Sequence, residues 1–318
     1  MLDGGWSTAQ DGCMSLRAAA RFAALSRRRR VLVVVSSLLA VVLLVMGGLR
    51  AWHAIEKHAR PHASAARPSA VLLVPGYGGN TRSLSALAAR IRAGGREATI
   101  VRLPGDGTGD LEAQAGVLNR YVNQAIGRGS PSVDVVGYSA GGVVARLWDV
   151  EYDGAKAARR IITLGTPLHG TRLAAAGAAF APAACPAACQ ELVPGSALLT
   201  RLQRAPFTGR PAWLSLWTDD DQVVQPADSA RLAGAVNVAL QNVCPGAVIA
   251  HGQLPTAPLV VGIVLHALGT APLHAPSSAE CGSLRALGGA ALAPARDAYV
   301  VMSLEAKLAH AAARNTAT

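Results

Sequence analysis

Short apolar runs alternate with longer amphipathic stretches from residue 70 onward. Runs of about 4–8 apolar or β-branched residues are typical of buried strands, and the stretches between them are of helical character. The predicted strands are 71–74, 98–103, 133–136, 161–164 and 213–217, and the predicted helices include 82–91 and 111–126. Strands that alternate with helices predict an α/β fold with a mostly parallel central sheet and flanking helices. Ligands bind such sheets at the carboxyl ends of the strands.

A long uncharged apolar run lies near the N-terminus, at residues 31–49. It nearly spans a bilayer core, and the four arginines 27–30 directly precede it. Because basic residues are denser on this side, we expect an N-terminal transmembrane helix, a signal anchor with the N-terminus inside. A cleaved signal peptide is the alternative, but the nearest small-X-small site, Ala63-Ser64-Ala65, lies far downstream.

The chain therefore divides into five predicted parts. These are a basic cytoplasmic tail (1–30), the anchor or signal peptide (31–49), a polar linker (50–69), a globular domain (70–283) and an Ala-rich C-terminal tail (284–318). The net charge is +11, and the first sixty residues carry nine Lys or Arg against three acidic residues. We attribute this excess to membrane orientation, and expect no nucleic-acid partner, because no basic patch with interleaved aromatic residues follows.

One motif has the context of a catalytic nucleophile. The β-branched run 133–136, apolar except for Asp134, leads into Gly137-Tyr138-Ser139-Ala140-Gly141, and an apolar helical stretch follows. A strand, a tight Gly-X-Ser-X-Gly turn and a helix form a nucleophile elbow, in which Ser139 is the nucleophile. Side chains at Gly137 or Gly141 would collide with neighbouring backbone. An incidental serine in a Gly-rich turn is the alternative.

The loop Pro75-Gly76-Tyr77-Gly78-Gly79-Asn80 follows the first predicted strand. In a serine hydrolase a loop at this place supplies a backbone N–H to the oxyanion hole. A phosphate-binding loop is the rival interpretation, but the Gly-Lys-Ser/Thr ending is absent. The acidic loop 105–110 is too short for a calcium loop, and we expect no metal and no cofactor.

A nucleophilic serine needs a base and a group that orients the base. His251 is the predicted base, because it follows the strand-like run 247–250 and precedes a glycine. His169, which ends the strand 161–164, is the rival. The triad acid lies among Asp219, Asp220 and Asp221, which spacing alone does not separate. Three adjacent carboxylates repel one another, so at most one should face a histidine.

Four cysteines and the long apolar segment 173–202 give two further predictions. Cys185 and Cys189 are expected to form a small disulfide loop in an exported domain, with half of a metal site as the alternative. Cys244 and Cys281 remain for a second disulfide. The apolar segment 173–202 is expected to overhang the active site as a cap, with ordinary helical packing as the alternative.

The ordered set of motifs resembles a known group. The resemblance rests on the runs 74–80, 104–110, 137–142, 163–171 and 251–255. Together they resemble small bacterial lipases and esterases of the α/β-hydrolase fold, in particular secreted or membrane-anchored triacylglycerol lipases of actinobacteria. The likeness covers roughly residues 70–283.

This resemblance implies roles for five residues. Ser139 would be the nucleophile and His251 the base, and the backbone N–H groups of Tyr77 and Ala140 would form the oxyanion hole. Asp221 is preferred over Asp220 as the acid, because Val223 and Val224 follow it in the family's pattern. The family often has His where this chain has Pro75. The difference leaves the backbone N–H of Tyr77 in place but removes a polar side chain from the loop.

The sequence thus predicts a serine carboxylic-ester hydrolase that acts on acyl esters, lipids in particular, outside the cytoplasmic membrane. An acyltransferase with the same triad is the alternative, and a non-catalytic binding module is disfavoured by the intact triad. We expect a monomer that is held to the cytoplasmic membrane by its N-terminal helix.

Overall fold

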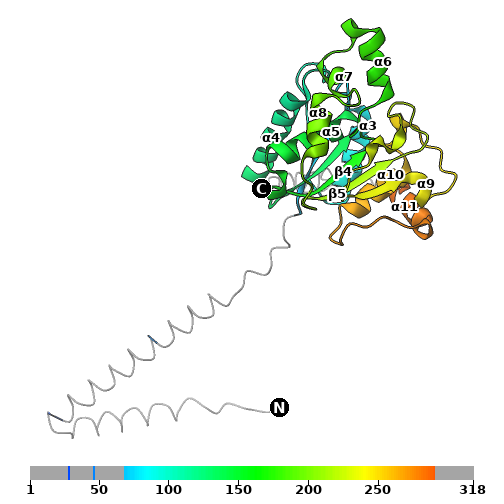
Figure 1. The fold of residues 1–318 in the computed structure, drawn as a ribbon. Coiled ribbons are helices and arrows are strands. Elements are labelled where there is room, and N and C mark those ends of the chain that lie inside the picture. The colour runs from blue at the N-terminus through cyan, green and yellow to red at the C-terminus, as the bar shows by residue number, and fades with distance from the viewer. Residues whose placement is uncertain (1–27, 29–45, 47–67, 291–318) are drawn as a thin grey trace, which may run out of the picture. The chain divides into compact units, whose positions relative to one another are not determined.

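The computed structural model describes residues 68–290, together with Arg28 and Met46. Its described part contains a six-stranded sheet with the order β2-β1-β3-β4-β5-β6 (Figure 1). The strands are β1 (Ala70–Val74), β2 (Ala98–Ile100), β3 (Val133–Tyr138), β4 (Ala158–Leu164), β5 (Ala212–Trp217) and β6 (Val236–Ala239). Every neighbouring pair is parallel. The predicted α/β architecture is confirmed.

Helices connect the strands, and their ends follow the local sequence. They are α3 (Arg82–Ala93), α4 (Leu111–Gly127), α5 (Ala140–Glu151), α6 (Arg172–Phe180), α7 (Ala187–Glu191), α8 (Ala197–Arg204), α9 (Leu240–Val243), α10 (Pro258–Ala267) and α11 (Cys281–Gly289). The carboxylate of Asp110 caps α4 by accepting the N–H of Ala113 at 2.7 Å. Pro258 opens α10, where its missing N–H costs nothing.

Helices cover both faces of the sheet, which explains why its strands are apolar at successive positions. In β1, Leu72 and Val74 pack with α4, α5 and α8, whereas Val71 and Leu73 pack with α3 and α10. Figure 1 shows α4 and α8 on one side of β4 and β5, and α10 and α11 on the other. The sheet is thus the middle layer, and its carboxyl edge is left to loops.

Two apolar runs differ from the prediction. The run 98–103 ends as a strand at Ile100. The run 247–250 is a loop, and His251 begins a short 3-10 helix (His251–Gln253) instead of following a strand. Side chains bind the backbone of this loop: the N–H of Ile249 donates to Asp220 Oδ2 at 3.2 Å, and Gln241 donates to the carbonyl of Ala247 at 3.0 Å. These bonds take the place of a strand partner.

The segment 173–202, predicted to be a cap, divides into several helices. Leu198 and Leu199 of α8 and Ala188 of α7 are buried in the same core as α4 and α5, so this part packs as an ordinary layer. In Figure 1, α6 projects at the periphery of the domain. It is mostly exposed, with Phe180 at 88%.

The ends of the chain extend beyond the described residues. The predicted membrane segment 31–49 lies outside them except for Met46, and so does most of the predicted C-terminal tail, from residue 291 on. Within the described residues, none of the helices has both the length and the apolar character needed to cross a bilayer. The predicted boundary at residue 283 falls inside α11, whose Leu284 is buried against α10.

Candidate active site

Ser139 occupies the turn between β3 and α5 with φ 53° and ψ −127°, a strained conformation for a residue other than glycine. The turn is tight on both sides. A Cβ on Gly137 would lie 2.5 Å from the Cα of Gly142, and one on Gly141 would lie 2.4 Å from the carbonyl oxygen of Pro75. The motif predicted collisions at these two positions, and glycine avoids them. The tight turn that results carries Ser139 at the carboxyl edge of the sheet.

His251 lies beside Ser139 although 112 residues separate them. Its Nε2 is 3.0 Å from the Oγ of Ser139. The ring is buried, and the hydroxyl of Tyr138 donates to the His251 carbonyl at 3.2 Å. Gly165, at φ 55°, leaves room for the ring, because a Cβ there would lie 3.1 Å from Nδ1 of His251.

Asp221 is the carboxylate that meets His251. Its Oδ2 lies 2.6 Å from Nδ1 of His251, and its Oδ1 accepts the N–H groups of Val223 at 2.8 Å and Val224 at 2.7 Å. Asp219 is exposed, and Asp220 faces Ile249 as described above. Only Asp221, at 1% exposure, is buried toward a histidine, in line with the repulsion argument.

These contacts define the proton arrangement. A ring nitrogen that bonds a carboxylate carries the proton, so Nδ1 of His251 donates to Asp221 and Nε2 accepts the proton of Ser139. Burial raises the pKa of the Tyr138 hydroxyl to about 12, and the charge of Asp221 adds to the effect. Tyr138 therefore stays protonated and keeps its bond to the His251 carbonyl.

The residues expected to donate to an oxyanion are Tyr77 and Ala140. The Gly76–Tyr77 loop touches Ser139, since a Cβ on Gly76 would lie 2.9 Å from the serine Cβ. Ala140 follows Ser139 as the first residue of α5. Within residues 68–290, neither the N–H of Tyr77 nor that of Ala140 donates to a protein acceptor. Their role as oxyanion donors stays a prediction.

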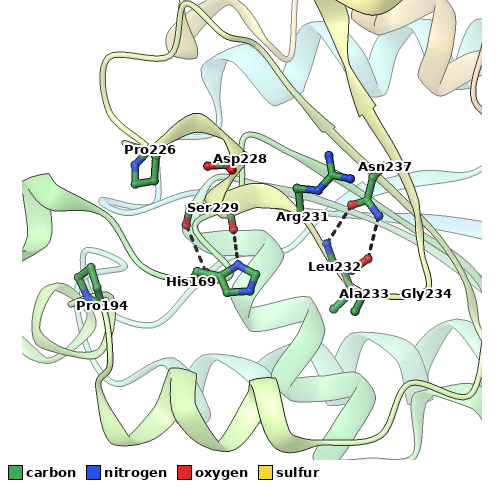
Figure 2. A pocket seen from close by; sticks show the side chains of 10 residues that line it. All are labelled: His169, Pro194, Pro226, Asp228, Ser229, Arg231, Leu232, Ala233, Gly234 and Asn237. Atoms are coloured by element: carbon green, nitrogen blue, oxygen red, sulfur yellow. Dashed lines mark hydrogen bonds between the residues drawn. The ribbon is translucent and has the colours of Figure 1, made fainter.

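The rival histidine lies elsewhere. Nδ1 of His169 bonds the carbonyl oxygen of Ser229 at 3.0 Å, and the ring lines a cavity of about 570 Å³ (Figure 2). Arg231 and Asn237 line the same cavity, whereas Ser139, Asp221 and His251 do not. His169 is thus not the partner of Ser139. Sequence reasoning gave no sign of this cavity.

Both predicted disulfides are present. Cys185 is joined to Cys189 across four residues, and Cys244 to Cys281 across 37 residues. Disulfides are typical of proteins outside the cytoplasm. In the described part of the chain, no group of three or more His, Cys, Asp or Glu side chains is arranged to hold a metal ion.

One side chain at the site was not singled out from the sequence. Tyr138 occupies the free position of Gly-X-Ser-X-Gly, which the motif does not restrict, and yet its hydroxyl holds the His251 loop. The available signal was the tyrosine itself, because a buried tyrosine hydroxyl usually has a hydrogen-bond partner.

Comparison with known proteins supports the fold. Neither a protein-family model nor a curated protein matches the sequence. Among solved structures, Aspergillus fumigatus lipase B superposes with a TM-score of 0.60 at 18% identity, over 74% of this chain and 63% of that one. A Bacillus licheniformis lipase in its propeptide form gives 0.55 at 17% identity, over 67% and 53%. The phospholipase PlaB of Legionella pneumophila, in complex with thio-NAD, gives 0.50 at 16% identity, over 68% and 61%.

The chain spans less than two thirds of the length of each of these structures. At such low identity, the likeness shows the fold alone. The protein has an α/β-hydrolase fold that is distantly similar to that of lipases and esterases. In it, buried Ser139 bonds His251, which pairs with Asp221, an arrangement consistent with a catalytic triad.

Proposed function

We propose that this protein is a serine carboxylic-ester hydrolase that acts on acyl esters, lipids in particular. The hydrogen bond of 3.0 Å from Ser139 to His251, continued at 2.6 Å to Asp221, carries the proposal. A nucleophile, a base and an orienting carboxylate in this geometry serve acyl transfer. The lipase and phospholipase names of the similar structures agree with an acyl ester as substrate. The narrower resemblance to actinobacterial triacylglycerol lipases is part of this proposal.

The first half of the reaction forms an acyl-enzyme. The Oγ of Ser139 attacks the ester carbonyl carbon while Nε2 of His251 takes the hydroxyl proton, and Asp221 stabilises the imidazolium. The oxyanion accepts the N–H groups of Tyr77 and Ala140, where α5 begins and its dipole favours negative charge. The carbon–oxygen bond to the alcohol then breaks, and the alcohol leaves with the proton from His251.

Water completes the cycle. It attacks the acyl carbonyl and gives a proton to His251, and the same N–H groups hold the second oxyanion. The acyl–oxygen bond to Ser139 breaks, the fatty acid leaves, and the proton returns to the serine. An acceptor other than water in this step would make the protein an acyltransferase.

We further propose that the reaction takes place outside the cytoplasmic membrane. The two disulfides support an oxidising compartment. The segment 31–49 would hold the protein, as a monomer, to the membrane.

Hydrolysis of p-nitrophenyl esters of increasing acyl length by the full chain in detergent tests the proposal. Ser139→Ala should fold normally and lose about 10³-fold or more in kcat. Ser85→Ala, an exposed serine on α3, is the matched control and should retain activity. Turnover that persists in Ser139→Ala would refute the assignment, and an added alcohol that outcompetes water would identify the acyltransferase.

A further inference from the structure

A seam of hydrogen bonds joins the segment that leads from β4 into α6 to the turn that carries Asp221. The N–H of His169 donates to the Ser229 carbonyl at 3.2 Å, the N–H of Arg172 donates to the Gln225 carbonyl at 2.9 Å, and the hydroxyl of Ser229 donates to the Gly170 carbonyl at 2.5 Å. The two segments are therefore fixed to each other over several residues.

Thr171 lies in the middle of this seam. Its hydroxyl donates to the carbonyl of Val223 at 2.5 Å and accepts the N–H groups of Gln225 at 3.3 Å and Leu173 at 3.4 Å. The side chain is buried, with 5% of its surface exposed. One hydroxyl thus uses its donor and both of its acceptor positions, and it belongs to the cap of α6 and to the acid turn at once.

Val223 is the link to the triad. Its carbonyl accepts from Thr171, and its own N–H donates to Oδ1 of Asp221 at 2.8 Å. The orientation of the carboxylate therefore depends on where this turn is held, since the second donor, Val224, belongs to the same turn. With Oδ1 held by these two N–H groups, Oδ2 points at Nδ1 of His251.

We propose that Thr171 is a positioning residue that orients Asp221 toward His251 through the backbone of Val223. The inference rests on the proposed function, because orientation of the acid matters only where His251 serves as the base. Loss of the hydroxyl leaves the part-buried carbonyl of Val223 without its donor, so the turn shifts to find another partner. A misplacement of about 1 Å at a catalytic group costs on the order of 100-fold in rate.

Thr171→Val, which keeps the shape and removes the hydroxyl, is the main variant. Its kcat should fall about 10- to 100-fold while KM changes little. The acid limb of its kcat/KM profile should move to lower pH, because an imidazolium that loses its carboxylate partner is less stable. Thr171→Ser keeps the hydroxyl and should restore both. Ser130→Ala, which removes a buried hydroxyl before β3 at the amino edge of the sheet, away from the acid turn, should behave as the wild type.

A readout that needs no turnover separates this inference from the proposed function. The Nδ1 proton of His251, held by Asp221, should give a far-downfield proton NMR resonance in the wild type and in Thr171→Ser, and lose it in Thr171→Val. An inactive wild type that shows this pattern would refute the hydrolase and leave the positioning role standing.

Three outcomes would overturn the positioning role. The first is an unchanged pH profile and resonance in Thr171→Val. The second is failure of Thr171→Ser to restore them, which would assign the effect to the methyl group. If Thr171→Val does not fold, Thr171→Ala takes its place. Unfolding of both is the third outcome, and it would make Thr171 a structural residue only.

Discussion

Oδ2 of Asp221 lies 2.6 Å from Nδ1 of His251, and Oδ1 of the same carboxylate is held by two backbone N–H groups. Asp220, its neighbour in sequence, has different partners and does not reach His251. The geometry therefore identifies Asp221, and not Asp220, as the partner of His251, a choice that sequence spacing alone does not make.

Asp221→Asn should lower kcat by about 10⁴-fold, because an amide in place of the carboxylate leaves His251 in the wrong tautomer and the imidazolium unstabilised. Asp220→Asn, in the same loop, should change kcat by less than about tenfold. Steady-state kinetics on a p-nitrophenyl ester measures both. An equal loss in the two variants would contradict the assignment of Asp221.

Gly165→Ala tests the space beside the triad. Gly165 has φ 55°, and an added Cβ would lie 2.5 Å from Leu254 Cδ1 and 3.1 Å from both Asp221 Oδ2 and His251 Nδ1. We expect a loss of kcat of about 100-fold, from displacement of the two side chains, in addition to backbone strain. Gly95→Ala has similar strain, at φ 80°, but open space around it, so it should lose about 1 kcal/mol of stability and keep its activity. Equal activity in the two variants would show that the close approach is unimportant.

Asp134 is a buried charge whose removal should destabilise the fold. It lies on β3 with no exposed surface, and it accepts the side chains of Arg96 and Arg159, the latter at 2.5 Å. Asp134→Ala would leave both guanidinium groups without this partner, at a cost of about 3–5 kcal/mol in urea unfolding. Glu97→Gln, whose ion pair with Arg128 is half exposed, should cost less than about 1 kcal/mol. The reverse order of the two losses would contradict this account.

Glu191 should make stability depend on pH. Burial raises the pKa of its carboxyl to about 7 from 4.5, and the charge of Asp110 adds to this, although the N–H of Leu111 donates to Oε2 at 2.9 Å. The folded protein thus binds this proton more tightly than the unfolded chain. The resulting stabilisation is complete below about pH 4.5 and is lost as the pH rises through about 7.

Glu191→Gln removes that titration. Relative to the wild type, its free energy of unfolding should rise by about 1–2 kcal/mol between pH 4.5 and pH 7, after allowance for screening by solvent. Urea unfolding at a series of pH values gives the difference. A difference that stays constant over this range would show that Glu191 titrates alike in both states.

The pattern of apolar positions was sufficient for five of the six strands and for the nucleophile turn, and β6 was not among the predicted strands. Runs such as 71–74 and 133–136 are buried on both faces, so every residue in them is apolar or paired, and that signal is local. The apolar composition of 247–250 favours a strand, but composition does not show that Asp220 and Gln241 bind the backbone of this loop.

By itself, the sequence determined the alternation of strands and helices from β1 to β5, the nucleophile turn around Ser139 and the cysteines that pair. Each of these depends on residues within one short window or on composition. Only the tertiary structure decided that Asp221 faces His251, that Gly165 leaves room for both, and that Thr171 holds the acid turn. These contacts join segments 30 to 112 residues apart, and the packing of the sheet's carboxyl edge, which no local period encodes, brings them together.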